Sequence, residues 1–387
     1  PRNRNLEIRS DRLMGNDPAL ILQFGTGRFL RAFIEMFVQD LNDEGTHIYS
    51  VIAVQSTPGP RATLINQSKN GFPVCVRGIK DGKTIDQTCQ VHSLSRALVA
   101  ENEWDSVLEL IRDPALRIVT SNTTEASYAL DPSDTPEAAP PKSFPAKLTR
   151  CLLERFTNDL PGLIIAPCEL VEHNGTVLRD LVLKQTETWN LDDSFVQWLG
   201  SDCIWLNSMV DRMVVPPKND DSLAENELSA TTEPFSLWVL ERVAGKEVPF
   251  LSHPDIVWAD NIDSSFLRKV RILNGAHTAM VAKYLPVGYR TVRDVMQNPE
   301  ASEWVRGLIF KEILPCIKNR TEDSELFATQ TLERLSNPFF EHKLADIAMG
   351  HEAKVKIRLQ STYDDYVKLF GDSPVRLKEA IKQDLTR

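Results

Sequence analysis

The sequence predicts an α/β protein with a Rossmann-like N-terminal domain and a mostly α-helical C-terminal domain. Three observations lead to this prediction. In the first half of the chain, short apolar runs alternate with amphipathic segments, an order that indicates βαβ units and a parallel sheet. A glycine-containing turn directly follows the first apolar run. Beyond about residue 260, the apolar spacing is nearly all helical.

Four buried strands are predicted from the apolar runs. They lie at 19–25, 49–56, 116–122 and 162–168. Between the first two, the segment RFLRAFIEMFVQDLNDEG has the spacing of a helix that stops at Gly45. A strand, a helix and a second strand in this order predict a right-handed βαβ unit and therefore a parallel sheet.

Three other segments of the N-terminal half carry recognisable signals. The turn sequence KDGK at 80–83 predicts an antiparallel hairpin, and 101–114 predicts a helix with an acidic first turn. The stretch 130–142 is rich in Pro, Asp and Ser. We expect it to be a loop or lid, because sheet-forming segments lie on both sides of it.

Chain length indicates more than one domain. A chain of 387 residues is too long for one ordinary hydrophobic core. The apolar segment 203–215 is expected to close the first domain, and the polar segment 216–234 to form the junction. We therefore predict a dinucleotide-binding domain over 1–233 and a mostly helical substrate and catalytic domain over 234–387.

Composition argues against several classes of function. A formal net charge of -10 disfavours nucleic-acid binding, which needs a basic surface. No apolar run reaches about 18 residues, so no membrane span is expected, and the polar N-terminus lacks a signal-peptide core. The six cysteines include no C-x-x-C pair, which predicts free thiols in a reducing cytoplasm and no metal site. Oligomeric state stays open between a monomer and a small homo-oligomer.

The turn after the first strand has features of a dinucleotide-binding fingerprint. Gly25 permits a tight turn, and Gly27 lets a pyrophosphate approach the backbone. Arg28 and Phe29 open the following helix and complete the predicted phosphate site. Leu30 occupies the place of the usual third glycine, so the pattern alone also fits a plain turn. Its position inside a βαβ unit favours nucleotide binding.

The end of the second strand bears on the choice of cofactor. Rossmann folds that bind NAD usually place an acidic residue there, on the ribose hydroxyls. Here the strand ends in Gln55, which is predicted to bind the ribose hydroxyls but would not repel a 2′-phosphate. Arg61 lies nearby in the sequence, so NADP stays open as an alternative to NAD.

Lys269, Asn274 and His277 form a candidate catalytic group within KVRILNGAH. On an α-helix, His277 falls about 80° and Asn274 about 140° from Lys269. A lysine with a lowered pKa protonates a developing alkoxide, while the other two residues hydrogen-bond the same oxygen. Taken by themselves, the three residues are more simply explained by a solvated lysine, a helix-bound asparagine and a core histidine.

KVRILNGAH also resembles the K-x(4)-N-x(2)-H signature of the polyol-specific long-chain dehydrogenases and reductases, the mannitol dehydrogenase family. Other blocks resemble the uronate-reducing branch of that family and follow in the same order along the chain. They are LQFGTGRFLRAF, SNTTEASY, SFPAKLTRCLLERF, PCELVEHNG, MVDR and ILNGAHTA. The resemblance implies a Rossmann-like domain, a helical C-terminal domain and a site between them.

The resemblance also implies roles for single residues. Lys269 would be the general acid/base, and Asn274 and His277 would orient and polarise the substrate oxygen. The predicted cofactor contacts near the nicotinamide ribose are Asn122, Thr123 and Glu125. The predicted substrate contacts are Asp211 and Arg212 in the MVDR block and, for a substrate carboxylate, Lys354 and Arg358.

These residues lead to one preferred function and two alternatives. Leu170 stands where polyol enzymes carry an asparagine, which favours a sugar acid over a neutral polyol. We therefore expect NAD(H)-dependent interconversion of a keto-uronate and an aldonate, such as tagaturonate and altronate. The first alternative is a mannitol- or fructuronate-type dehydrogenase of the same family. The second, of another class, is a nucleotide-binding regulator without catalysis.

Overall fold

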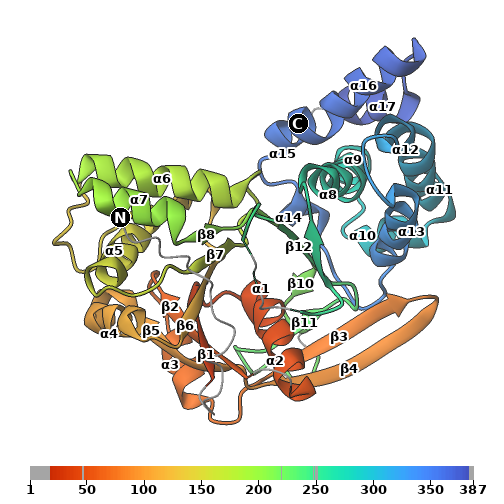
Figure 1. Cartoon of the computed structure of the whole chain (residues 1–387). Coiled ribbons are helices and arrows are strands. Elements are labelled where there is room, and N and C mark those ends of the chain that lie inside the picture. The colour runs from red at the N-terminus through yellow and green to blue at the C-terminus, as the bar shows by residue number, and fades with distance from the viewer. Residues whose placement is uncertain (1–17, 46–47, 219, 247, 249–251, 383–387) are drawn as a thin grey trace.

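A computed structural model of the chain describes residues 18–45, 48–218, 220–246, 248 and 252–382 (Figure 1). Its centre is a six-stranded parallel sheet with the strand order β5-β2-β1-β6-β7-β8. The strands are β1 (Ala19–Phe24), β2 (Tyr49–Gln55), β5 (Leu94–Val99), β6 (Leu116–Ser121), β7 (Ile164–Pro167) and β8 (Ile204–Trp205). The strands predicted at 19–25, 49–56, 116–122 and 162–168 are confirmed.

Each face of the parallel sheet packs against its own set of helices. Successive residues of a strand point to opposite faces, so Ile21 and Leu22 of β1 enter different hydrophobic cores. One core includes α2 (Ile34–Glu44) and α3 (Arg61–Gln67). The other includes α4 (Ala100–Arg112), α5 (Phe144–Thr157), α6 (Asn174–Thr188) and α7 (Asp193–Ser201). Helices therefore cover both sides of the sheet, as in other parallel sheets.

Two smaller sheets extend the N-terminal half toward the helical half (Figure 1). One has the order β10-β11-β3-β4 and the other β13-β12-β9. Their strands are β3 (Phe72–Lys80), β4 (Lys83–Val91), β9 (Ser208–Asp211), β10 (Val214–Val215), β11 (Ala230–Thr232), β12 (Leu237–Glu241) and β13 (Ile256–Ala259). The hairpin predicted at 80–83 is confirmed: Asp81 and Gly82 form its turn with positive φ.

The C-terminal half is helical and has a core of its own. Three of its helical segments, η3, η4 and η5, have π-helical hydrogen bonding, which widens the helix locally. In chain order the elements are α8 (Asp263–Arg268), η3 (Lys269–Asn274), α9 (Gly275–Tyr284), α10 (Val292–Gln297), α11 (Pro299–Gly307), η4 (Leu308–Ile313), α12 (Leu314–Ile317), α13 (Ser324–Leu335), α14 (Leu344–Ile347), α15 (His351–Lys354), η5 (Val355–Gln360), α16 (Ser361–Phe370) and α17 (Val375–Lys382). The predicted fold class is confirmed.

The predicted division at 233/234 remains a prediction, and the strand pairing bears on it. β11 lies before residue 233 and pairs with β3, while β12 lies after it and pairs with β9. Both strands therefore belong to sheets that begin in the N-terminal half. The helical region starts only at Asp263. Within the described ranges, no helix is long and apolar enough to cross a membrane.

The helix predicted after the glycine turn is interrupted. It consists of α1 (Arg28–Arg31) and α2, which are separated at Ala32 and Phe33. The Phe33 ring packs against Phe29 and Phe37, each with 4.9 Å between ring centroids. This aromatic packing accompanies the non-helical backbone of Phe33, a local break that apolar spacing does not reveal. The predicted stop at Gly45 is confirmed, with a left-handed φ of 73°.

Candidate active site

The glycine turn lies at the carboxyl end of β1, in the middle of the parallel sheet. Gly25 has a φ of +124°, and an added Cβ there would meet Asn122 O at 3.3 Å, so only glycine suits this turn. A Cβ on Gly27 would meet nothing within 4 Å, so its backbone faces open space. Such a turn between a strand and a helix start suits a pyrophosphate that needs close contact with the backbone.

Arg28 and Arg61 add positive charge beside this turn. Arg28 Nε is buried, and within the described part of the chain it has no hydrogen-bond partner. Burial and the nearby charge of Arg61 lower the pKa of Arg28. An arginine next to a second arginine, and short of acceptors, suits an anion such as a cofactor phosphate. The turn and the two arginines at this edge of the sheet therefore fit the phosphates of a dinucleotide.

The Gln55 side chain, predicted to bind the ribose, makes three hydrogen bonds within the protein. Its side-chain amide donates to Thr57 O at 2.9 Å and to Gly59 O at 2.8 Å, and its oxygen accepts from Ala62 N at 2.8 Å. The side chain is buried and holds the turn between β2 and α3. Both of its amide hydrogens are therefore already bonded to backbone carbonyls, and this geometry gives no support to the predicted ribose contact.

The segment after β6 is organised by Glu169, a residue that the sequence did not single out. The Glu169 carboxylate accepts from Thr123 N at 2.8 Å, from Thr123 Oγ1 at 2.9 Å and from Tyr128 Oη at 3.0 Å. Asn122 donates its amide to Cys168 O at 2.8 Å. Asn122 and Thr123 therefore lie at the carboxyl ends of β6 and β7, next to the glycine turn. Glu125 follows in an exposed 3-10 turn.

Lys269 and Asn274 begin and end the π-helical segment η3. The α-helical angles predicted for these residues are wrong, because π-helical hydrogen bonds join residues five apart. Asn274 therefore lies about one turn above Lys269, on nearly the same side of the helix. His277 follows on α9, where it is buried. The wider helix brings the predicted Lys, Asn and His closer to one face than a regular helix does.

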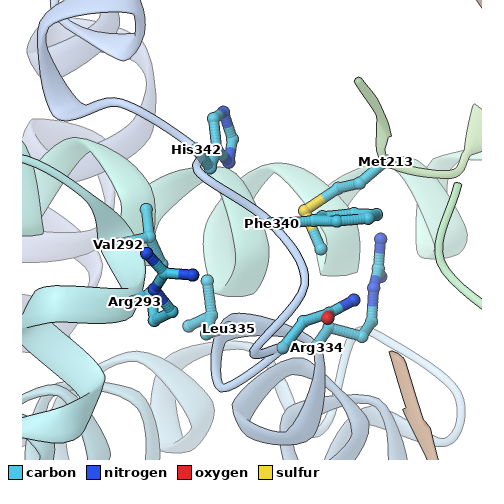
Figure 2. Close-up of a pocket in the computed structure, with 8 residues that line it drawn as sticks. Met213, Val292, Arg293, Arg334, Leu335, Phe340 and His342 are labelled. Atoms are coloured by element: carbon cyan, nitrogen blue, oxygen red, sulfur yellow. The ribbon is translucent and has the colours of Figure 1, made fainter. Parts of the chain in front are cut away.

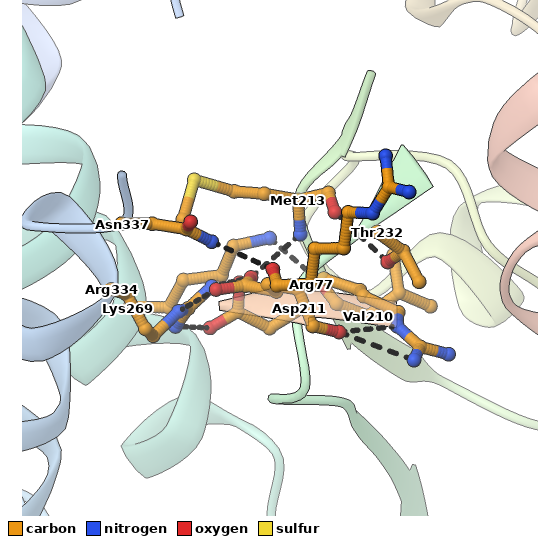
Figure 3. Close-up of polar contacts among 10 residues, drawn as sticks. Arg77, Val210, Asp211, Met213, Thr232, Lys269, Arg334 and Asn337 are labelled. Carbon is orange, nitrogen blue, oxygen red and sulfur yellow. Dashed lines mark hydrogen bonds and ion pairs between the residues drawn. The ribbon is translucent and has the colours of Figure 1, made fainter. Parts of the chain in front are cut away.

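The Lys269 side chain is buried between the two halves of the protein. Its Nζ donates to Val210 O of β9 at 2.5 Å (Figure 3). Burial lowers the pKa of Lys269; the carboxylate of Asp211 opposes this effect, and the guanidinium groups of Arg334 and Arg358 reinforce it. The cations near Lys269 are thus distant in sequence, whereas Arg268 donates instead to Glu322 O.

Arg334 of α13 binds two buried carboxylates beside Lys269 (Figure 3). It donates to both oxygens of Asp211 at 2.9 Å and to both oxygens of Glu233 at 2.7 and 2.9 Å. Burial opposes ionisation of Asp211, yet Arg334 and Lys269 hold its pKa below the usual value. Burial raises the pKa of Glu233 despite the same arginine. The negative charge of Asp211 adds to this rise in the pKa of Glu233.

Arg212 lies away from this group. Asp211 and Arg212 are neighbours, and neighbouring residues of extended chain point to opposite sides. The Arg212 guanidinium donates to Ala32 O at 2.9 Å and to Glu233 O at 3.2 and 3.3 Å. The Arg212 side chain therefore connects the α1–α2 junction with the residue that follows β11, all within the N-terminal half. The substrate contact predicted for Arg212 therefore has no support from the geometry, and the cation that meets Asp211 is Arg334.

Lys354 and Arg358 complete the positive side of the site. Lys354 Nζ donates to Ile347 O at 2.8 Å, and an Arg358 nitrogen lies 3.4 Å from Thr278 Oγ1. Burial lowers the pKa of both side chains, and the charge of Glu125 opposes the effect in both. Glu125 of the N-terminal half therefore lies near these two cations. Among the residues that the structure describes, these side chains make no other hydrogen bond, so most of their N–H groups are left for another acceptor.

His277 lies within range of the charges of Arg334, Arg358 and Lys354. Burial depresses its pKa, and His342, Arg334, Arg358 and Lys354 depress it further, so the imidazole is neutral. Its Nε2 is buried and has no hydrogen-bond partner among the residues that the structure places. A buried nitrogen without a partner is costly unless a ligand supplies one. The site thus combines a buried lysine, an unpartnered imidazole and two cations with free donors.

Cysteines and possible metal ligands lie outside this group. All six cysteines are free thiols, as predicted. Glu172, His173 and Asp263 place one donor atom each within 4.8 Å of one another, but Glu172 and Asp263 are exposed. His173 Nε2 and Asp263 Oδ1 lie 3.1 Å apart, a contact that an ordinary surface ion pair explains. The expectation that the protein has no metal site remains a prediction.

Comparisons with known proteins agree with this architecture. The mannitol dehydrogenase Rossmann domain matches residues 19–250, and the mannitol dehydrogenase C-terminal domain matches residues 261–364. Altronate oxidoreductase of Bacillus subtilis (strain 168) is 36% identical over 377 residues, which cover 93% of this chain and 78% of that protein. The enzyme of the same name from Halalkalibacterium halodurans is 35% identical over 375 residues, with coverage of 93% and 73%.

Two solved structures share the fold. The ternary complex of Pseudomonas fluorescens mannitol 2-dehydrogenase with NAD and D-mannitol has a TM-score of 0.77 at 21% identity, and covers 95% of this chain and 78% of its own. Substrate-free D-sorbitol dehydrogenase also has a TM-score of 0.77, at 22% identity and with coverage of 89% and 75%. The two domain matches and the full-length relatives lead to one conclusion. The chain belongs to the mannitol dehydrogenase family, which has a Rossmann NAD-binding domain and comprises oxidoreductases that act on CH–OH groups.

Proposed function

We propose that this protein interconverts a keto-uronate and its aldonate, of the tagaturonate and altronate type, with NAD(H) as cofactor. One observation carries the proposal. Lys354 and Arg358 each make one side-chain hydrogen bond within the described chain, and they lie near the buried Lys269 and the imidazole of His277, whose Nε2 has no partner there. A neutral polyol needs no such cations, whereas a substrate carboxylate does. The relatives named altronate oxidoreductase support the same substrate class.

Lys269 is proposed as the general acid/base. Bound nicotinamide would supply the hydride in reduction and take it up in oxidation. In reduction, Lys269 Nζ gives a proton to the carbonyl oxygen as negative charge develops there, and in oxidation it removes the hydroxyl proton. Burial and the neighbouring arginines lower its pKa toward the working range of such a group. Lysine in water would stay protonated and could not act as the base.

Asn274 and His277 are proposed to hold the reacting oxygen beside Lys269. The Asn274 amide lies about one π-helical turn from Lys269, and His277 Nε2 has no partner within the described chain. A donor from each residue would stabilise the developing charge before the proton arrives. Asp211 acts on Lys269 rather than on the substrate, because Arg334 already occupies both of its oxygens.

Cofactor contacts are proposed at the carboxyl ends of β1 and β6. Gly25, Gly27, Arg28 and Phe29 would hold the phosphates, and Asn122, Thr123 and Glu125 would lie near the nicotinamide ribose. Gln55 is withdrawn from this set. NAD is proposed as the cofactor, and NADP stays open. Because all six cysteines are free thiols, we expect the reaction to take place in the cytoplasm.

A substrate panel tests the proposal. Tagaturonate, fructuronate, fructose, altronate and mannitol are assayed with NAD(H) and NADP(H), and kcat/KM is compared across the panel. The highest value is expected for a keto-uronate or its aldonate. A higher kcat/KM for mannitol or fructose than for any sugar acid would contradict the proposal.

The same assay tests the proposed acid/base. Lys269→Met keeps the apolar stem and removes the amine. It is expected to lower kcat by at least about a hundredfold, the usual scale for a lost general acid/base, with NADH binding retained. Lys184→Met, on an exposed face of α6, is the matched control and should leave kcat unchanged. An unchanged rate in Lys269→Met would exclude the assigned role.

A further inference from the structure

The buried ion group beside Lys269 has many hydrogen-bond donors and few free acceptors. Lys269, Lys354 and Arg358 all donate. The carboxylates of Asp211 and Glu233 already accept from Arg334, and Glu233 accepts from Met213 N as well. A sugar acid, however, brings several hydroxyl groups, each of which donates one hydrogen. Buried hydroxyls without acceptors would weaken binding, so the site needs acceptors that these charged groups do not provide.

Two neighbouring imidazoles supply them. The rings of His277 and His342 meet edge to face, with 4.9 Å between centroids and 71° between planes. Burial lowers the pKa of both, so both are neutral, and a neutral imidazole has one donor and one acceptor nitrogen. Within the described part of the chain, neither side chain makes a hydrogen bond. Because the planes cross steeply, their nitrogens point in different directions and can meet different oxygens of one substrate.

The position of His342 is fixed by its backbone. Its carbonyl accepts from Val292 N at 2.9 Å, and Leu344 N donates to Arg290 O at 2.9 Å, so the chain is pinned on both sides of Lys343. A short antiparallel bridge joins Lys343 to Thr291 in the same place. A side chain held in this way loses little further entropy when it binds a ligand.

His342 also lines a small cavity whose wall includes Arg334, the arginine of the buried ion group. Figure 2 shows it with Met213, Phe340 and Arg334 around this cavity. Phe340 is buried and Arg334 holds Asp211, so the lining that His342 shares combines an apolar side chain, a charged side chain and the amide of Asn337. Through its ring contact with His277, the His342 imidazole lies next to the predicted catalytic group, on a loop that the helical signature does not include.

We propose that His342 is a substrate-binding residue that accepts a hydrogen bond from a substrate hydroxyl away from the reacting carbon, and so helps to select a polyhydroxy chain. This inference extends the proposed function, in which His277 binds the reacting oxygen. His342 contributes affinity for the bound sugar rather than the chemical step. Its loss should therefore raise KM while kcat stays nearly constant, which is the pattern of uniform binding.

The test compares His342→Phe with His342→Gln, using whichever sugar or sugar acid the wild-type enzyme turns over best. The phenylalanine ring keeps the packing against His277 and removes the acceptor, and we expect KM to rise by at least about tenfold. Glutamine restores an acceptor and should recover part of the loss. His253→Phe is the matched control, since His253 also packs edge to face on an aromatic ring, Phe37, at 4.8 Å.

Two results would overturn the inference. One is an unchanged KM in His342→Phe. The other is a lower melting temperature and a lower kcat at unchanged KM, which would assign His342 to packing alone. Failure of the proposed function is separate, because it appears in the wild-type enzyme as a preference for mannitol or fructose. In that case the His342 variants are compared on that sugar, and a raised KM still supports the inference.

Discussion

At the scale of single residues, the site depends on balanced charges around Lys269. Asp211 and Glu233 favour its protonated form, while burial, Arg334 and Arg358 favour the neutral amine. Arg334 has a further effect, because it neutralises the two carboxylates that would otherwise hold a proton on the lysine. The neutral amine is the form that removes a hydroxyl proton.

Replacing Arg358 tests this balance through pH. In the oxidation of an aldonate, the rate falls as pH falls through the pKa of Lys269, because the protonated amine is no base. Arg358→Met removes a cation, so the pKa of Lys269 rises and the fall in kcat should occur at higher pH than in the wild type. The measurement is kcat against pH at saturating substrate. The surface variant Arg179→Met is the control. If the fall in kcat moved to lower pH in Arg358→Met, or did not move relative to this control, Arg358 would not lower the pKa of Lys269 as assigned.

Sequence predicted part of this residue group for a physical reason. Lys269, Asn274 and His277 share one helical segment, so their spacing carries information. Arg334 lies 123 positions from Asp211, and no local spacing connects them. Glu233 and His342 were missed for the same reason. The partners of Gln55 are backbone groups of the following turn, which apolar periodicity does not describe.

At the scale of elements, α2 carries a buried acid under the glycine turn. Glu35 is fully buried, and Gln23 Nε2 donates to its Oε1 at 2.8 Å. Within the described residues its other oxygen, Oε2, has no partner. Burial therefore raises the pKa of Glu35 to about 7, although Gln23 and Arg31 oppose the rise. A carboxylate in this position becomes charged at neutral pH only at a cost to stability.

Glu35→Gln should remove that cost. Folding raises the pKa of Glu35 from 4.5 to about 7. Its favourable contribution to the free energy of unfolding is therefore complete below about pH 4.5 and is lost as pH rises through 7. From pH 5 to pH 8, the variant should gain up to about 3 kcal/mol in unfolding free energy relative to the wild type. Urea unfolding at both pH values measures this gain. The exposed Glu303→Gln should show no such trend, and an equal trend in both variants would refute the explanation.

Elements differ in how well the sequence predicted them. β1, β2, β6 and β7 are short, mostly buried and largely apolar, so their local signal is strong. The break between α1 and α2 and the π-helical turns depend on packing with distant segments. Arg31, for example, donates to Thr26 O at 2.6 Å and to Leu228 O at 2.9 Å. Such contacts change the backbone without changing the apolar spacing.

At the scale of the whole molecule, the candidate site is also where the two halves are joined. Lys269 donates to Val210 of β9, and Arg334 binds Asp211 and Glu233 across the same boundary. Nearby, Asn337 donates to Arg77 O at 2.9 Å, and Figure 1 shows the β3–β4 hairpin extending toward α13. The contacts that position the lysine are therefore also contacts that hold the helical half in place.

Removing Arg334 should therefore affect the whole chain. Arg334→Met leaves two carboxylates buried without their counter-ion, and we expect a loss of about 3–5 kcal/mol in unfolding free energy. Arg320→Met removes an exposed ion pair with Asp365 and should cost less than about 1 kcal/mol. Urea unfolding followed by circular dichroism measures both.

A triple variant separates buried charge from lost packing. Adding Asp211→Asn and Glu233→Gln to Arg334→Met removes the two uncompensated negative charges. The packing lost with the arginine side chain is the same in both variants. Part of the lost stability should return, because the penalty comes from unpaired buried carboxylates. If the triple variant were no more stable than Arg334→Met, the arginine would act through packing with Phe235, whose ring centroid lies 4.1 Å from the guanidinium carbon.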